Sequence, residues 1–182
     1  MICLGRVFPM DLFEAIKRRR SIRDYTNEDV SEEDLEKILE AAIWAPSAGN
    51  RQAWDFVVVR DDSVKKALVR AALGQRFIAE ASVAIVVCAN MERSASRYGS
   101  RGSGLYCIQD TATAIQNMLL TVTALGLGAC WIGAFYEEEV AKILELPRGV
   151  RPIAIIPIGH PARVPQATPR FRLADVLHYE KW

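Results

Sequence analysis

The spacing of apolar residues along the chain predicts five helices. One of them begins at Ser31, which is followed by three acidic residues and is typical of a helix N-cap, and it ends before Pro46. The longest helix is apolar on most of its faces, so we expect it to lie near the centre of the fold. This long helix spans 105–125, and the other three span 10–19, 63–73 and 137–144.

Short unbroken apolar runs predict the strands. The runs at 54–60, 82–89 and 152–158 are typical of buried strands, and 129–133 is a shorter one. These strands are few and irregularly spaced, whereas the strands of a parallel Rossmann sheet alternate regularly with helices. No Gly-x-Gly-x-x-Gly motif follows a strand; the pair Gly126 and Gly128 follows the long helix and indicates a helix C-cap. The pattern therefore argues against a Rossmann sheet.

Three segments do not fit a helix or strand pattern. Residues 90–104 are rich in glycine, serine and arginine, which predicts a mobile loop. Prolines recur at positions 157, 161, 165 and 169, and this spacing excludes a helix and predicts an extended C-terminal arm. The first nine residues lack the long apolar core of a signal peptide. We therefore expect 1–9 to be a dispensable arm and 10–182 to form a single domain.

Composition excludes several classes of partner. The chain has 182 residues, of which 51% are hydrophobic, and its 23 Lys and Arg balance 22 Asp and Glu. This balance gives no general attraction to nucleic acid or to an anionic membrane, and no apolar run is long enough to span a bilayer. The four cysteines are widely spaced, so we interpret them as reduced residues of a cytoplasmic protein. Two histidines are too few for a His-based metal site.

Arginines cluster where the first helix ends. Arg19, Arg20, Ser21 and Arg23 fall within five positions, and guanidinium groups with a hydroxyl suit a phosphate and a flat ring that accepts hydrogen bonds. The alternative is a solvated basic helix end that is favoured by the helix dipole.

Two further polar groups stand later in the chain. Asn50 and Gln52, in the segment 45–54, carry amides that both donate and accept hydrogen bonds, although a polar turn after Pro46 is the alternative. Arg170 and Arg172 lie on the arm, where ordinary surface charge is the alternative.

Four segments together resemble the FMN-dependent nitroreductase family over nearly the whole chain, from about residue 10 to residue 182. The first is Arg-Arg-Ser-Ile-Arg at 19–23, and the second is Ala-Pro-Ser-Ala-Gly-Asn-Arg-Gln at 45–52. The third is Ala-Leu-Gly-Leu-Gly-Ala-Cys-Trp-Ile-Gly-Ala-Phe at 124–135. The fourth joins Pro-Ile-Gly-His-Pro at 157–161 to Arg-Phe-Arg-Leu at 170–173.

The resemblance implies an α+β fold of the nitroreductase type. This fold has a central, mostly antiparallel or mixed sheet flanked by helices, a long central helix at a dimer interface and an extended C-terminal arm. It also implies a homodimer with two non-covalent FMN sites between the subunits, with NADH or NADPH as electron donor. Residues 90–104 correspond to the substrate lid, which varies within the family.

The resemblance also assigns the site residues. Arg19, Arg170 and Arg172 would meet the phosphate, and Arg20, Ser21 and Arg23 would contact the phosphate, the ribityl chain and the pyrimidine edge of the flavin. Gln75 would reach the pyrimidine ring, and Ile132 and Gly133 would offer backbone contacts near the reactive flavin nitrogen. The flavin bound mainly by the other subunit would be approached by Pro46, Ser47, Ala48, Asn50 and Gln52.

We therefore expect an enzyme that takes a hydride from NAD(P)H and reduces a nitroaromatic, a quinone or a similar small molecule by a ping-pong mechanism. The flavin carries the chemistry, and Arg23 tunes it. The alternatives are a non-catalytic flavin- or nucleotide-binding module, a reductive dehalogenase or a flavin-fragmenting enzyme. We expect Trp54, Trp131 and Trp182 to lie in the core or an interface. The lone acid Asp110 of the long helix we expect to have a buried partner, with a role as a base as the alternative.

Overall fold

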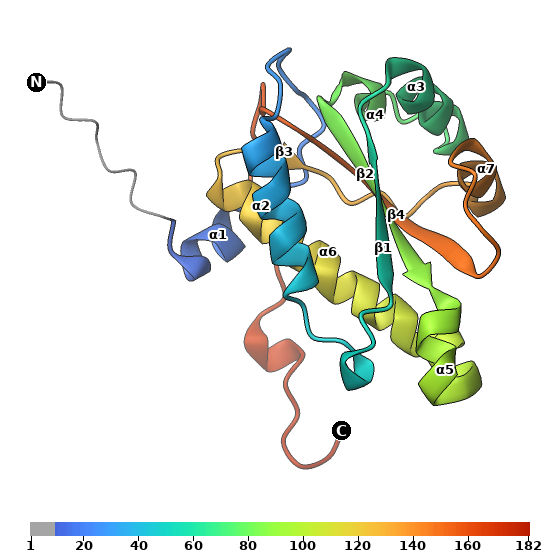
Figure 1. Ribbon diagram of the computed structural model, residues 1–182. Helices are drawn as coiled ribbons and strands as arrows, with labels where there is room; N and C mark the ends of the chain where they lie inside the picture. Colours follow the sequence, from blue (N-terminus) through green and yellow to red (C-terminus); the bar gives the residue numbers. More distant parts are fainter. Residues whose placement is uncertain (1–9) are drawn as a thin grey trace, which may run out of the picture.

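Four antiparallel strands form the sheet at the centre of the molecule (Figure 1). The strands lie side by side in the order β1-β2-β4-β3. Their bounds are β1 (Trp54–Val59), β2 (Val83–Asn90), β3 (Gly128–Ala129) and β4 (Val150–Gly159). The computed structural model describes residues 10–182, so the expected N-terminal arm at 1–9 lies outside the described residues. The predicted α+β class with a mostly antiparallel sheet is confirmed.

Helices cover both faces of this sheet. In Figure 1, α2 and α6 lie on one side of the strands, and α3, α4 and α7 lie on the other. The bounds are α1 (Leu12–Arg18), α2 (Glu32–Ile43), α3 (Asp62–Ala71), α4 (Phe77–Glu80), α5 (Met91–Arg101), α6 (Cys107–Ala124) and α7 (Glu137–Ile143). The hydroxyl of Ser31 accepts from the backbone N–H of Asp34 at 3.1 Å, so the predicted N-cap is confirmed. The short α4 has no counterpart in the sequence pattern.

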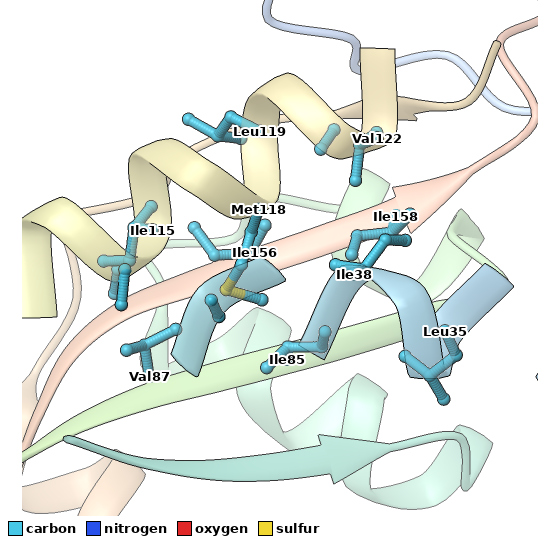
Figure 2. Packing of buried hydrophobic residues seen from close by; sticks show 14 of the residues in the cluster. Leu35, Ile38, Ile85, Val87, Ile115, Met118, Leu119, Val122, Ile156 and Ile158 are labelled. Atoms are coloured by element: carbon cyan, nitrogen blue, oxygen red, sulfur yellow. The ribbon is translucent and has the colours of Figure 1, made fainter. Parts of the chain in front are cut away.

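The alternation of side chains along β2 explains why its sequence is an unbroken apolar run. Val83, Ile85 and Val87 pack against α2 and α6, and the core on this face is drawn in Figure 2. Ala84, Val86 and Cys88 face the other way, into the core formed with α3 and α7. A strand that is buried on both faces shows no polar alternation in its sequence.

The long helix α6 lies where its composition predicts. Its buried side chains include Ile115, Met118 and Val122, which pack on the sheet beside α2 (Figure 2). The helix ends as expected at Gly126, whose φ of 76° lies in the left-handed region. The N–H of Leu127 then donates to the carbonyl of Val122 at 2.9 Å, which satisfies a carbonyl at the end of the helix.

The prediction of a mobile loop at 90–104 is wrong. Residues Met91–Arg101 form α5, and a π-helical turn over Gly102–Tyr106 leads directly into α6. Contacts far along the chain hold α5 in place, because the guanidinium of Arg93 lies 2.9 Å from the carboxylate of Asp55 and donates to two carbonyls beside it. The predicted strand at 129–133 is also shortened to Gly128–Ala129.

Beyond residue 161 the chain forms an extended, exposed arm, as predicted, with one 3₁₀ turn at Leu173–Asp175. Of the three tryptophans, Trp54 is buried in the core, as expected. Trp131 is 39% exposed and Trp182 is fully exposed on the arm, so for these two an interface stays the prediction. Within residues 10–182, no helix is both long enough and apolar enough to cross a membrane.

Candidate functional site

A hollow of about 550 Å³ lies between the end of α1 and the first part of the arm. Its size is typical of small-molecule sites. Five cationic side chains line it and no carboxylate does; the cations are Lys17, Arg19, Arg20, Arg23 and Arg170. Ser21 adds a hydroxyl, and residues 165–168 of the arm close one side. So many uncompensated cations around one hollow indicate a site for an anionic group.

The backbone that carries these side chains is fixed by the turn after α6. The N–H of Ile22 donates to the carbonyl of Ala129 at 2.9 Å, and Ser21 pairs with Ala129 as in a parallel sheet. A side chain at Gly128 would come within 2.8 Å of Ile22, so only glycine permits this approach. The first and third sequence motifs therefore meet in space.

Tyr25 anchors the arginine segment, residues 19–23, through its hydroxyl. Its hydroxyl donates to the carbonyl of Ile22 at 2.8 Å, and it also lies 3.2 Å from the carbonyl of Pro157 in β4. Burial raises the pKa of Tyr25, so the phenol stays neutral and serves as a hydrogen-bond donor. This bond links the arginine segment to the central sheet.

Arg20 has a structural role beside its place in the lining. Its guanidinium donates to the carbonyl of Lys17 at 2.7 Å and to that of Arg19 at 2.9 Å, at the end of α1. These carbonyls have no partner within the helix, and a cation there also suits the helix dipole. The buried Nε of Arg20 has no hydrogen-bond partner among the described residues, which leaves one donor unused beside the hollow.

Arg23 lines the hollow and also contacts the aromatic ring of Phe77, in α4. Its guanidinium carbon is 5.8 Å from the centre of the Phe77 ring, so the ring supports the cation on one face. The buried thiol of Cys130 is close by. Burial raises the pKa of Cys130, and the cation of Arg23 and the hydroxyl of Ser21 partly offset this shift.

Gln75 connects α3 to the chain beyond Gly133. Its side-chain amide donates to the carbonyl of Ala72 at 3.0 Å and to that of Ala134 at 3.1 Å. The amide nitrogen is therefore committed within the protein, and the amide oxygen is the atom left for a ligand.

The structure corrects the expectation for Ile132. Its N–H donates to the carbonyl of Ile155 at 3.0 Å, and its carbonyl accepts from the N–H of Ile155 at the same distance. Ile132 therefore has no backbone N–H to offer a ligand. The N–H of Gly133 makes no hydrogen bond with residues 10–182, so Gly133 is the residue that can supply this contact.

The polar residues predicted to approach the flavin of the other subunit form a tight turn over residues 46–52. The hydroxyl of Ser47 accepts from the N–H of Gln52 at 2.9 Å, and the side-chain oxygen of Asn50 accepts from the Gln52 amide at 3.3 Å. Gly49, Asn50 and Gln52 have φ values of 53°, 55° and 49°, in the left-handed region. For Gln52 this costs about 1 to 3 kcal/mol, whereas asparagine adopts this region more readily, and such strain is concentrated at functional sites.

One copy of the chain does not bring the two groups together. Ala48 contacts Asp110 at the start of α6, whereas the arginine segment lies beside Gly126 and Leu127, just beyond its end. A helix of 18 residues is about 27 Å long. At one end of α6, therefore, lie Pro46, Ser47, Ala48, Asn50 and Gln52, and toward the other lie Arg19, Arg20, Ser21, Arg23 and Arg170. Gln75 and Gly133 do not line the hollow.

Arg172 belongs to neither group. Its guanidinium pairs with the carboxylate of Asp175 at 2.7 Å within the turn of the arm, and it does not line the hollow. Lys17 and the arm segment 165–168 were missed by sequence reasoning. Lys17 stands in the same basic run as the arginines, so the charge pattern could have identified it; the arm segment carries no such signal.

The site offers binding groups rather than groups for acid–base or nucleophilic catalysis. The cations and amides can hold an anion and a hydrogen-bonding ring, and the buried thiol of Cys130 is kept protonated. In residues 10–182, no three His, Cys, Asp or Glu side chains come close enough together to hold a metal ion.

Comparison with known proteins agrees with this geometry. The chain is 36% identical over 184 residues to a Methanothermobacter thermautotrophicus protein provisionally named NADH dehydrogenase/NAD(P)H nitroreductase, covering 98% of this chain and 91% of that one. It is 32% identical over 185 residues to a Bacillus subtilis FMN reductase that uses NAD(P)H, covering 94% and 74%.

A solved structure supports the same relationship. The NADPH:FMN oxidoreductase from Vibrio harveyi, in complex with NAD+, superposes with a TM-score of 0.87 at 26% identity, covering 94% of this chain and 77% of that one. The model of the "Nitroreductase family" matches residues 16–80 and 69–160, which include the arginine segment, the turn at 46–52 and Gly133. With the sheet, the cationic hollow and the relatives in agreement, the chain belongs to the nitroreductase family.

Proposed function

We propose that this protein is an FMN-dependent oxidoreductase that takes electrons from NADH or NADPH and passes them to a small organic acceptor. The observation that carries the proposal is the hollow with five cations and no carboxylate, built from α1 and the arm. Its residues fit FMN, because a phosphate needs charge-assisted donors and the flavin ring needs hydrogen bonds along its pyrimidine edge. Relatives named for FMN and NAD(P)H support this choice.

Each residue has a separate role in this proposal. Arg19 and Arg170 hold the phosphate, and the hydroxyl of Ser21 meets the ribityl chain. Arg23 stands beside the pyrimidine edge, where its charge favours the reduced, anionic form of the ring. Gln75 contributes its amide oxygen, and Gly133 contributes its free N–H. Arg172 reaches the phosphate only after it leaves Asp175.

The bound FMN would supply the chemistry of accepting two electrons and passing them on. The protein holds the ring, fixes its charge and shapes the space above it. Donor and acceptor would use the same space in turn, which is the basis of the ping-pong mechanism. We propose nitroaromatics and quinones as acceptors.

We also propose that the active form is a homodimer. The two groups of site residues lie at opposite ends of α6, so a second copy is needed to place a turn at 46–52 beside the hollow of the first. Exposed apolar side chains supply surface for such contact, including Phe13 on α1 and Phe171 on the arm, which are 71% and 83% exposed. A cytoplasmic location agrees with Cys88, Cys107 and Cys130, which are unpaired and buried.

Two experiments test this proposal. Acid precipitation should release a flavin that chromatographs as FMN, and steady-state kinetics with varied NAD(P)H and acceptor should give parallel double-reciprocal lines. Colour retained in the pellet, or FAD in the supernatant, would contradict non-covalent FMN. A yellow protein that NAD(P)H does not reduce would support the non-catalytic flavin-binding module, and loss of halide or of the flavin itself would point to the dehalogenase or flavin-fragmenting alternative.

A further inference from the structure

The turn at 46–52 is attached to α6 by side chains of that helix. The carboxylate of Asp110 accepts from the N–H of Ala48 at 2.9 Å. The hydroxyl of Thr113 lies 3.1 Å from the carbonyl of Pro46, but it lies closer, at 2.7 Å, to the backbone carbonyl of Asp110 in its own helix. Further along α6, the amide of Asn117 donates to the carbonyl of Ala41, in α2, at 3.0 Å. Asp110 therefore holds the turn itself, whereas Asn117 holds only the helix that precedes it.

The turn needs such support because its conformation is strained. Asn50 and Gln52 both have left-handed φ values, which persist only where the surroundings determine them. The bond from Gln52 to the hydroxyl of Ser47 lies within the turn and moves with it. The bond from Ala48 to Asp110 connects the turn to a buried helix, so it fixes the position of the turn relative to the rest of the protein.

Asp110 is unusual in its surroundings. Asp110 is buried, with only 5% of its surface exposed to solvent. One of its carboxylate oxygens has no hydrogen-bond partner among residues 10–182. Burial raises the pKa of the Asp110 carboxyl, and the hydrogen bond from the N–H of Ala48 partly offsets this shift. The one hydrogen bond of the Asp110 carboxylate among residues 10–182 therefore goes to the turn.

We infer that Asp110 is a positioning residue, which fixes the Asn50 and Gln52 side chains for the flavin by holding the N–H of Ala48. The inference rests on the proposed function in one respect, namely that the turn meets the flavin. The attachment of the turn to α6 does not depend on that function. The two parts can therefore be tested separately.

The first test measures amide hydrogen exchange of the full chain without flavin. In Asp110→Ala, exchange at Ala48 and Gln52 should be at least about tenfold faster than in the parent, because the bond that ties the turn to a buried acceptor is lost. Asp110→Asn keeps an oxygen at the same place and should stay within about threefold of the parent. Asn117→Ala is the matched control, since it removes a bond of α6 that does not reach the turn.

The second test measures FMN affinity of the same variants by quenching of flavin fluorescence. Asp110→Ala should weaken binding at least about tenfold, Asp110→Asn should restore most of it, and Asn117→Ala should leave it unchanged. Unchanged exchange at Ala48 in Asp110→Ala would overturn the inference. Faster exchange with unchanged affinity would also overturn it, while tight FMN binding by the parent would leave the proposed function standing.

A third variant covers the case in which Asp110→Ala does not fold. Asp110→Ser keeps a polar side chain that is one bond shorter, so its oxygen does not reach the N–H of Ala48. If Asp110 positions the turn, Asp110→Ser should weaken FMN binding at least about tenfold, whereas Asp110→Asn should stay close to the parent. Equal FMN affinities of Asp110→Ser and Asp110→Asn would contradict the inference.

Discussion

The backbone N–H of Ile22 lies 2.9 Å from the carbonyl oxygen of Ala129, and this bond joins segments that are more than a hundred residues apart. It places the arginines after α1 against the turn that follows α6. The approach depends on Gly128, because a Cβ there would lie 2.7 Å from a side-chain carbon of Ile22. This Cβ would clash with three side-chain atoms of the buried Ile22, and a β-branched side chain cannot move aside without shifting the backbone.

We predict that Gly128→Ala destabilises the protein and weakens FMN binding together. Overpacking of this kind costs about 1 to 3 kcal/mol, and the displaced backbone carries Ser21 and Arg23. Urea denaturation and flavin fluorescence measure the two effects. Gly104→Ala is the control, because its Cβ would meet no atom within 4 Å, and alanine in place of this helical glycine should leave stability unchanged or raise it by up to about 1 kcal/mol. An unaffected Gly128→Ala variant would show that the two segments do not meet as described.

Arg170 and Arg172 should differ in their effect on FMN. Arg170 lines the hollow, whereas Arg172 is held by Asp175. A charge-assisted contact is worth about 1.5 to 3 kcal/mol, so Arg170→Ala should weaken FMN binding at least about tenfold. Arg172→Ala should have the smaller effect. The opposite order would mean that the arm rearranges when the phosphate binds and that Arg172 is the principal contact.

The sequence predicts the core of this fold well, because the elements that pack on both faces of the sheet have strong apolar patterns. The unbroken run of β2 and the apolar faces of α6 result from burial alone. The helix α5 could not be predicted in this way. It is held by contacts of Arg93 with Asp55 and with the carbonyls of Gln52 and Trp54, and a polar, glycine-rich sequence does not reveal contacts that distant.

The candidate site, like the fold, could be predicted only in part from the sequence. Motif chemistry identified Arg19, Ser21, Arg23 and Arg170, which the structure places around or beside one hollow. It could not show that the N–H of Ile132 is used by Ile155, because a strand pairing fixes that bond. Nor could it show that one oxygen of Asp110 holds Ala48 while the other has no partner, since both facts depend on the packing of the turn against α6.

Arg23 should tune the flavin rather than only hold it. Removal of its positive charge destabilises the reduced, anionic form more than the oxidised form, so Arg23→Gln should lower the reduction potential. A loss of about 1.4 kcal/mol lowers the potential of a two-electron couple by about 30 mV. Redox titration and stopped-flow reduction by NADH measure this effect, with the exposed Arg148→Gln as a charge-matched control. If FMN affinity falls steeply while the potential stays that of the parent, Arg23 is an anchor only.

The stability of the protein should depend on pH through Asp110. Because burial raises the pKa of this carboxyl, the folded protein keeps the proton at pH values where the unfolded chain has released it. The contribution of this group to the unfolding free energy of the parent therefore falls as pH rises. The fall begins near the pKa of the carboxyl in the unfolded chain, about 3.9. Asp110→Asn has no such proton.

The difference in unfolding free energy between Asp110→Asn and the parent should thus shift in favour of the variant as pH rises. Urea denaturation of both proteins at several pH values from about 3.5 to about 6.5 measures this difference, and the other titrating groups cancel in it. A difference that is flat with pH, or that shifts toward the parent, would show that the carboxyl of Asp110 is not destabilised by its burial.

Anaerobic titration of the purified protein with NADH or NADPH, followed by a nitroaromatic or a quinone, tests the proposed function most directly. A flavin bound beside the five cations should show its absorption in the visible range, lose it as about one equivalent of nicotinamide is oxidised, and regain it when the acceptor is added. The same spectrum should return after each cycle. A protein that binds no flavin, or a flavin whose colour neither nicotinamide removes, would contradict the account.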